Sequence, residues 1–190
     1  MKHSTGVTLI ELMIAVALFA IVLTLGVPSF QKVIENNSLA TRLNILVTTL
    51  NYARSEAVKR GKRVSVCKSD DGVDCGAGGY EDGWIVFVEE VASGDGTRQV
   101  ATEELIQIRE SLNANMTLRG NNNFINFISF MPTGEANNIG RFVLCKESDL
   151  EKSRAIFVIR TGRVRLAKDE NNDNIPEDEL GNNITSCTPP

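Results

Sequence analysis

The first thirty residues constrain the fold of this chain most strongly. From Val7 to Phe30 the sequence reads VTLIELMIAVALFAIVLTLGVPSF, which is long enough to cross a bilayer as one helix. Its only formal charge is Glu11. An acid at the centre of a membrane helix costs about 2.5 to 3.5 kcal/mol on insertion scales, so a lone carboxylate indicates a function. The sequence therefore predicts a membrane-spanning segment, residues 7–30, in which Glu11 has a specific role.

A short polar leader, MKHSTG, precedes the apolar stretch. A secretory signal peptide also begins with a basic region, but its apolar core is shorter, lacks an internal acid and ends at a small-residue cleavage site. An ordinary membrane anchor fits the length of the stretch but gives no reason for Glu11. Both alternatives leave the acid unexplained.

The segment GVTLIEL, residues 6–12, resembles the class III signal of type IV pilins and type II secretion pseudopilins. The resemblance implies that residues 1–6 are a leader and that a prepilin peptidase cuts between Gly6 and Val7. It also implies methylation of the new amino terminus at Val7, where many members of the family have Phe. Glu11 is then the fifth mature residue. A buried carboxylate can pair with the free amine of a neighbouring subunit, which would set the register between helices in a filament.

The helix is predicted to continue past the membrane as an amphipathic half, residues 31–61. Steps of four and three place on one face Leu39, Leu43, Leu46, Leu50, Ala53 and Ala57. The opposite side carries Arg42, Asn44, Asn51 and Glu56. Lys59 and Arg60, followed by Gly61, are typical of a helix C-terminus. A coiled-coil dimer would also use this face, but fewer than four heptads are sustained, so packing on a sheet is favoured.

After Gly61 the pattern changes to short β-rich runs separated by Gly, Asn and Asp, and residues 62–190 are predicted to form a β-rich globular head. The expected strands are Arg63–Cys67, Trp84–Val88, Leu105–Arg109, Met116–Arg119, Ile125–Phe130, Arg141–Cys145, Ala155–Ile159 and Arg163–Leu166. One long helix followed by strands indicates an α+β fold with antiparallel sheets, because alternating βαβ units would need further helices.

Three later segments resemble the GspH/FimT/FimU class of minor pilins and pseudopilins. They are ARSEA at residues 53–57, GWIVF at 83–87, and Phe130 followed by PTG at 132–134. The resemblance implies a type IV pilin-like fold, in which a long N-terminal transmembrane helix packs on an antiparallel β-sheet head. Trp84 and Phe87 also suit plain core packing, which agrees with this fold.

Four cysteines, Cys67, Cys75, Cys145 and Cys187, form no CxxC motif, so zinc and thioredoxin-like chemistry are not indicated. An even count in an exported domain suggests two disulfides. Three pairings are possible. We favour Cys67 with Cys75, which closes a glycine-rich loop, and Cys145 with Cys187, which holds the C-terminal tail. Free structural thiols are the alternative.

A cationic run near the C-terminus contains no acid and comprises Lys152, Arg154, Arg160, Arg163, Arg165 and Lys168. An acidic block follows at once, and the two could neutralise each other. Within the run, Gly162-Arg163-Val164-Arg165 resembles the GRxR motif of FimT proteins that bind DNA during natural transformation. Alternation in a strand would point both arginines to one face, where they could contact phosphates of double-stranded DNA together with Lys168. An edge strand protected from pairing by its arginines is the simpler interpretation.

The acidic block offers a weak calcium candidate. Asp169, Asn171 and Asp173 have the spacing of the first three ligands of a calcium loop, but Leu180 stands where an EF-hand needs a bidentate Glu. An EF-hand is therefore excluded. A looser calcium site and a solvated acidic loop both remain as interpretations.

No enzyme and no cofactor are expected. Removing the leader removes Lys2 and the only histidine, His3, and changes the net charge from −4 to −5. Without histidine, no Ser-His, Cys-His or His-metal site can form. The chain also lacks a phosphate-binding glycine loop and a nucleophile elbow.

The resemblance instead implies an assembly protein. Such a minor pilin would help to prime a type IV pilus or the homologous type II secretion pseudopilus, at or near the filament tip. Its partners would be the prepilin peptidase, other minor and major pilins or pseudopilins, and the membrane. The chain would cross the inner membrane once, with a periplasmic head, before it enters the filament. The alternative is a minor pilin that binds double-stranded DNA during uptake.

Overall fold

The computed structural model describes residues 8–90, 94–112 and 115–188. The chain divides into two compact units, of which the first ends at Ser38 and the second begins at Leu39. Helix α1 (Leu9–Arg60) belongs in part to each unit, and all strands belong to the second unit, which we call the head.

In the first unit, α1 exposes its apolar side chains. The large apolar side chains described there, from Leu9 to Ile34, are between 46% and 78% exposed. Such a surface is unfavourable in water, and large exposed apolar patches mark interaction or membrane surfaces. This part of α1 is also long and apolar enough to span a bilayer.

The end of α1 agrees with the prediction from the sequence. The helix ends at Arg60, and Gly61 has a left-handed φ of 64°. Glycine takes this conformation without the steric cost that a Cβ imposes, which makes it the usual residue just after a helix.

The head contains two four-stranded sheets, and every neighbouring pair of strands is antiparallel. The first sheet has the order β3-β2-β1-β5, with β1 (Arg63–Lys68), β2 (Trp84–Glu89), β3 (Leu105–Arg109) and β5 (Phe127–Phe130). The second has the order β4-β6-β7-β8, with β4 (Met116–Gly120), β6 (Gly140–Lys146), β7 (Asp149–Val158) and β8 (Val164–Leu166). A short 3₁₀ helix, η1 (Tyr80–Asp82), precedes β2. The eight predicted strands are all present.

One strand boundary was predicted wrongly. The strand expected at Ala155–Ile159 is β7, which begins six residues earlier at Asp149. The hairpin between β6 and β7 turns at Glu147 and Ser148, whose φ values are 56° and 58°, and Lys146 pairs with Asp149. Such a turn normally carries Asn or Gly. This sequence has neither, so the turn gave no signal.

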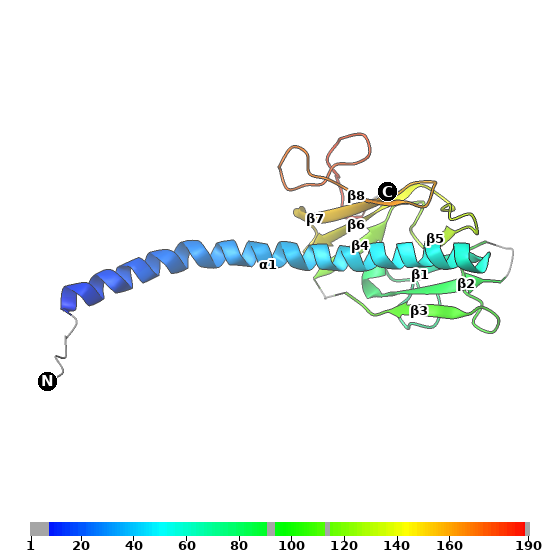
Figure 1. Cartoon of the computed structure of the whole chain (residues 1–190), viewed down its shortest axis with the longest axis horizontal. Coiled ribbons are helices and arrows are strands. Elements are labelled where there is room, and N and C mark those ends of the chain that lie inside the picture. Colours follow the sequence, from blue (N-terminus) through cyan, green and yellow to red (C-terminus); the bar gives the residue numbers. More distant parts are fainter. Residues whose placement is uncertain (1–7, 91–93, 113–114, 189–190) are drawn as a thin grey trace. The chain divides into compact units, whose positions relative to one another are not determined.

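The main core lies between α1 and both sheets (Figure 1). The predicted helix face is confirmed, because its six apolar residues are at most 1% exposed. They pack in one cluster with inward side chains of both sheets, which include Val64, Val66, Trp84, Val86, Phe142, Leu144, Ile156 and Val158. The head is thus built around the C-terminal half of α1.

The faces of the two sheets that point away from this core carry one smaller cluster each, and each cluster contains a disulfide. On the first sheet, Cys67 is bonded to Cys75 beside Ile85 and Phe87. On the second, Cys145 is bonded to Cys187 beside Val143, Ala155 and Ile184. These are the two pairings that we favoured from the sequence. Each disulfide holds a loop or the tail over the outer side of one sheet.

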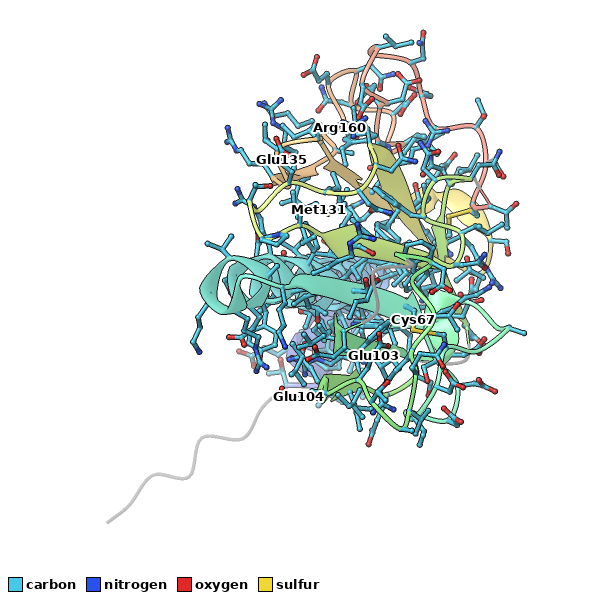
Figure 2. The ribbon with its side chains drawn as sticks, turned by 90° about the vertical axis from the view of Figure 1, so that its right-hand side faces the viewer. Cys67, Glu103, Glu104, Met131, Glu135 and Arg160 are labelled. Atoms are coloured by element: carbon cyan, nitrogen blue, oxygen red, sulfur yellow. A yellow bond between two sulfur atoms is a disulfide. The ribbon has the colours of Figure 1, made fainter. Side chains whose placement is uncertain are left out.

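Two hairpin turns of the same design meet beside α1. The turn Pro132-Thr133-Gly134 follows β5, and the turn Arg160-Thr161-Gly162 joins β7 to β8. In each, the glycine N–H donates to the residue before the turn, and φ is positive, at 82° for Gly134 and 75° for Gly162. Figure 2 shows the two turns next to each other, and the N–H of Ala136 donates to the carbonyl of Arg160 across 3.0 Å.

The exposure of the Glu56 side chain differs from the one predicted from the sequence. Its place opposite the apolar face predicted an exposed side chain, yet Glu56 is only 7% exposed. Its carboxylate accepts a 2.7 Å hydrogen bond from Nε of Arg60, whose Nη1 in turn pairs with Glu104 at 2.6 Å. The hydrogen bond from Arg60 is the largest cause of a lowered pKa of Glu56, and the nearby Lys59 ammonium lowers the pKa further. Arg60 stands about one helical turn after Glu56, so its long side chain can lie over the acid and cover it.

Candidate functional site

The N-terminus of α1 has a defined polar arrangement around Glu11. The Oε2 atom of Glu11 accepts hydrogen bonds of 3.3 Å from both the N–H and the hydroxyl of Thr8. In return, the Thr8 hydroxyl accepts one of 3.3 Å from the N–H of Glu11. This is a reciprocal capping box, which satisfies donors that a helix N-terminus leaves free. The Thr-x-x-Glu spacing signals such a box, and we did not interpret it so from the sequence.

The predicted cleavage and methylation positions, Gly6 and Val7, lie outside the described residues. Their roles stay predictions. The structure does place Thr8 and Glu11 at the start of an exposed apolar helix, directly after those positions.

The GRVR segment forms the outer edge of the second sheet. β8 is the last strand in its order and pairs only with β7 among the described strands. Val164 packs against the main core, whereas Arg163 and Arg165 are exposed, so the predicted alternation of these residues is confirmed. Within the described parts of the chain, the side chains of Arg163, Arg165 and Lys168 have no hydrogen-bond or ion-pair partner.

The glycine of this segment is required by packing. A Cβ at Gly162 would overlap the carbonyl oxygen of Gly134 in the neighbouring turn. The positive φ of Gly162 also disfavours any other residue. The fold thus explains Gly162 but leaves the two arginines free for an interaction.

In the described part of the chain, the acidic block does not neutralise Arg163, Arg165 or Lys168. Among the described residues, no ion pair joins the β8 cations to the acids that follow. The acids instead hold their own loop. Asp178 accepts 2.9 Å bonds from the N–H groups of Leu180 and Asn182, and Glu177 accepts from those of Glu170 and Asn171. Such bonds lower the pKa of Asp178, with the N–H of Asn182 as the largest cause.

The calcium candidate uses its oxygens in the same way. Asp169 accepts from the N–H groups of Asp173 and Asn174, and Asp173 accepts from Ile175 and from the amides of Asn171 and Asn183. Over residues 8–90, 94–112 and 115–188, no group of three or more His, Cys, Asp or Glu side chains could hold a metal ion. Calcium binding by Asp169, Asn171 and Asp173 stays a prediction.

An open groove of about 840 Å³ lies beside β8. Its apolar lining residues are Ile139, Phe157, Ile159, Leu166 and Ala167. Arg165 and Lys168 line it together with the acidic residues Glu170, Glu177, Asp178 and Glu179. No sequence pattern indicates this groove, because its lining residues come from strands and a loop that only the fold brings together.

A buried polar cluster lies on the outer face of the first sheet. One carboxylate oxygen of Glu89 accepts hydrogen bonds from the hydroxyls of Ser65 and Ser129, and the other lies 3.6 Å from Nη1 of Arg63. Burial raises the pKa of Glu89 in spite of these contacts. The cluster therefore links the stability of the head to pH.

Comparison with known proteins gives matches over most of the chain. The family model described as type II transport protein GspH matches residues 43–162, and that of the prokaryotic N-terminal methylation motif matches residues 1–27. The sequence matches no curated protein significantly.

Solved structures with a similar fold include the type IV minor pilin FimU of Pseudomonas aeruginosa. One crystal form has a TM-score of 0.57 and 20% identity, covering 80% of this chain and 97% of FimU. A second gives 0.54 and 19%, covering 78% and 99%. The minor pseudopilin EpsH of Vibrio cholerae has a TM-score of 0.44 and 10% identity, covering 68% of this chain and 95% of EpsH.

Proposed function

The chain belongs to the GspH/FimU class of type IV minor pilins and type II secretion pseudopilins, and from that premise we propose that it helps to prime assembly of a type IV pilus or secretion pseudopilus. In this proposal, the subunit sits at or near the filament tip. It is held in the inner membrane by the apolar part of α1, with its head in the periplasm, until it enters the filament.

The observation that carries this proposal is the placement of Glu11. The residue is the lone acid of the apolar stretch 7–30, and it lies in the first turn of α1 with its carboxylate bonded only to Thr8 among the described residues. An ordinary anchor would gain only a helix cap from this acid. A filament subunit would gain a further interaction, because the carboxylate could leave Thr8 and pair with the amine of a neighbouring helix.

The proposed sequence of events starts with the prepilin peptidase. Cleavage between Gly6 and Val7 would free an amine on Val7, which stays cationic after methylation. In a bundle of such helices, each amine and each Glu11 carboxylate would satisfy one another away from water. Pairing of this kind fixes how far one helix is shifted along the next.

The test compares two variants that share one local effect. Both Glu11→Ala and Thr8→Ala remove the reciprocal capping box, but only the first removes the carboxylate. We expect both to be cleaved, and we expect Glu11→Ala alone to be lost from filaments purified from cells. Normal filament numbers and normal incorporation of Glu11→Ala would contradict the register role. Equal losses in both variants would assign Glu11 to helix capping.

DNA binding is the second candidate, favoured by the exposed and unpaired Arg163 and Arg165. The full chain in detergent would be titrated with double-stranded DNA across a salt series. Loss of affinity in Arg163→Ala/Arg165→Ala, with a salt slope smaller by about two, would support phosphate contacts. Lys59→Ala/Lys62→Ala, which removes the same charge elsewhere on the head, is the matched control and should keep the native slope. Absence of binding by the native chain would exclude this candidate.

A further inference from the structure

The groove beside β8 has an apolar floor that is partly exposed, because Leu166 is 58% and Ile139 39% exposed, whereas Phe157 is only 7% exposed. Ile139 and Ile159 lie opposite each other at the ends of β6 and β7, and Phe157 is the next outward residue of β7. These side chains are not part of the main core, which contains the alternate residues Ile156 and Val158 of β7. The other end of this sheet face is covered by the tail through Cys187 and Ile184, whereas the groove end is open.

The charged residues that line the groove fall into two groups by their position in the chain, which we call its two walls. Arg165 and Lys168 come from β8 and the residues after it, and Glu170 and Glu179 come from the acidic loop. In the described parts of the chain, none of these four side chains makes an ion pair or hydrogen bond. The walls do not close on each other, so both stay available to an occupant.

This arrangement of charges favours a peptide segment over a nucleic acid as the occupant of the groove. A nucleic acid would bring phosphates to Arg165 but would also bring them to Glu170 and Glu179, and it makes no use of an apolar floor. A peptide segment can satisfy all three surfaces at once, with an apolar side chain on the floor, a carboxylate toward Arg165 and Lys168, and a cation toward the acids. Grooves of 300 to 1,000 Å³ are typical of ligand sites, and this one lies in that range.

A second copy of this chain fits less well. Leu180 is the most exposed of the large apolar side chains described in the head, at 86%. Its neighbours in sequence are Glu179 and Gly181, with Asp178 before them. If that loop entered the groove of another copy, it would supply carboxylates to both walls and a cation to neither.

We propose that this groove binds an extended segment of a different subunit of the same filament, in which an apolar residue stands between an acidic and a basic one. The inference rests on the proposed assembly function and names the surface and partner chemistry for it. Opposite charges on the two walls would fix the direction of the segment, since a reversed segment would face like charges.

The test uses photo-crosslinking of the full chain in cells. A photoreactive residue replaces Leu166, which lines the groove and is 58% exposed, and in a control strain it replaces Ile125, which is 54% exposed and does not line it. We expect the Leu166 variant to crosslink to a different pilin-like subunit, at a segment with the acid–apolar–base pattern. The Ile125 variant should not give this product.

Charge reversal then tests the walls. Arg165→Glu should lower the yield of the crosslink by about tenfold or more, because it puts like charges together. Arg160→Glu makes the same charge change on a neighbouring exposed residue that does not line the groove, and it should change the yield less than about twofold. Replacing the acidic residue of the partner segment by a basic one should restore the yield of the crosslink in the Arg165→Glu variant.

The outcomes separate this inference from the function on which it rests. A crosslink to a second copy, a crosslink to DNA, or no crosslink from a subunit that reaches the filament would each overturn the groove assignment alone. Absence of the cleaved, membrane-bound protein from purified filaments would overturn the assembly function and the groove assignment with it.

Discussion

Arg54 and Gly134 are 80 residues apart in the chain, yet Nε of Arg54 donates a 2.8 Å hydrogen bond to the carbonyl oxygen of Gly134. The same guanidinium donates from Nη2 to the carbonyl of Thr161, 3.0 Å away. Gly134 lies in the turn after β5 and Thr161 in the turn between β7 and β8, so one side chain of α1 joins a turn of each sheet. Arg54, Gly134 and Gly162 are therefore parts of one contact between α1 and the two turns.

Replacing Arg54 should destabilise the head. In Arg54→Ala, two turn carbonyls lose a charged donor, and we expect a loss of about 2 kcal/mol in the free energy of unfolding. Urea unfolding of the full chain in detergent, followed by the fluorescence of the single tryptophan, Trp84, measures this loss. Arg160→Ala removes an exposed arginine nearby and should stay within about 0.5 kcal/mol of the native chain. Similar values for the two variants would show that the Arg54 bonds contribute little.

The two glycines with left-handed backbone in the second sheet region should respond differently to alanine. At Gly181 the φ is 82° and an added Cβ meets nothing within 4 Å, so Gly181→Ala should cost only the backbone strain of about 1 to 2 kcal/mol. Gly162→Ala adds the overlap with the Gly134 carbonyl and should cost more. Thermal unfolding of both variants under one condition gives the comparison, and equal shifts would mean that the two turns can move apart.

The two disulfides should differ in their contribution to stability. They join residues 42 and 8 positions apart, so chain entropy predicts losses of about 4 kcal/mol for Cys145→Ala/Cys187→Ala and about 2.5 kcal/mol for Cys67→Ala/Cys75→Ala. Urea unfolding of the two double variants tests the order. A larger loss for the Cys67 pair would indicate that packing of the loop over Ile85 and Phe87, more than chain entropy, decides the effect.

Glu89 should make the stability of the head fall as the pH rises from acid to neutral. Its pKa is raised in the folded chain, so above the ordinary glutamate value the unfolded chain ionises first and is favoured. Glu89→Gln keeps an acceptor for Ser65 and Ser129 but cannot ionise. We therefore expect the stability of Glu89→Gln relative to the native chain to increase between pH 4 and pH 7.

Other groups contribute to the same pH range, so the difference between the two proteins is the quantity to measure. Arg63 and Glu103 act on Glu89 and are present in both. Glu56 acts in the opposite direction, because its lowered pKa adds stability that is lost as the pH falls below its ordinary value. A difference that stays constant from pH 4 to pH 7 would show that Glu89 ionises as readily in the folded chain as in the unfolded one.

The elements of the fold could be predicted because each rests on local signals. The stripe from Leu39 to Ala57 indicated the buried helix face, Gly61 its end, and alternating residues such as Val64 and Val66 the strands. The start of β7 was missed, because its turn uses Glu147 and Ser148 in conformations that usually need Asn or Gly. Glu56 was placed in solvent, because its position opposite the apolar face outweighed the helical spacing that brings Arg60 beside it.

The candidate sites could be predicted only in part. Glu11 stands out in sequence because a charge in an apolar run is rare, and Arg163 and Arg165 stand out through their alternation. The floor of the groove does not stand out in the sequence, because Ile139, Phe157 and Ile159 look like ordinary strand residues. Their place in the groove lining depends on how the strands and the acidic loop pack together, which is a property of the folded head.

In the proposed assembly function, the capping box at the start of α1 would let a lone subunit wait in the membrane. While Thr8 holds the carboxylate of Glu11 through two hydrogen bonds, chance encounters with other helices would offer the acid little. Recruitment would then require a partner whose amine competes successfully with these two bonds. Entry into the filament would accordingly be an exchange with a threshold, and helices without a matching amine would not be recruited.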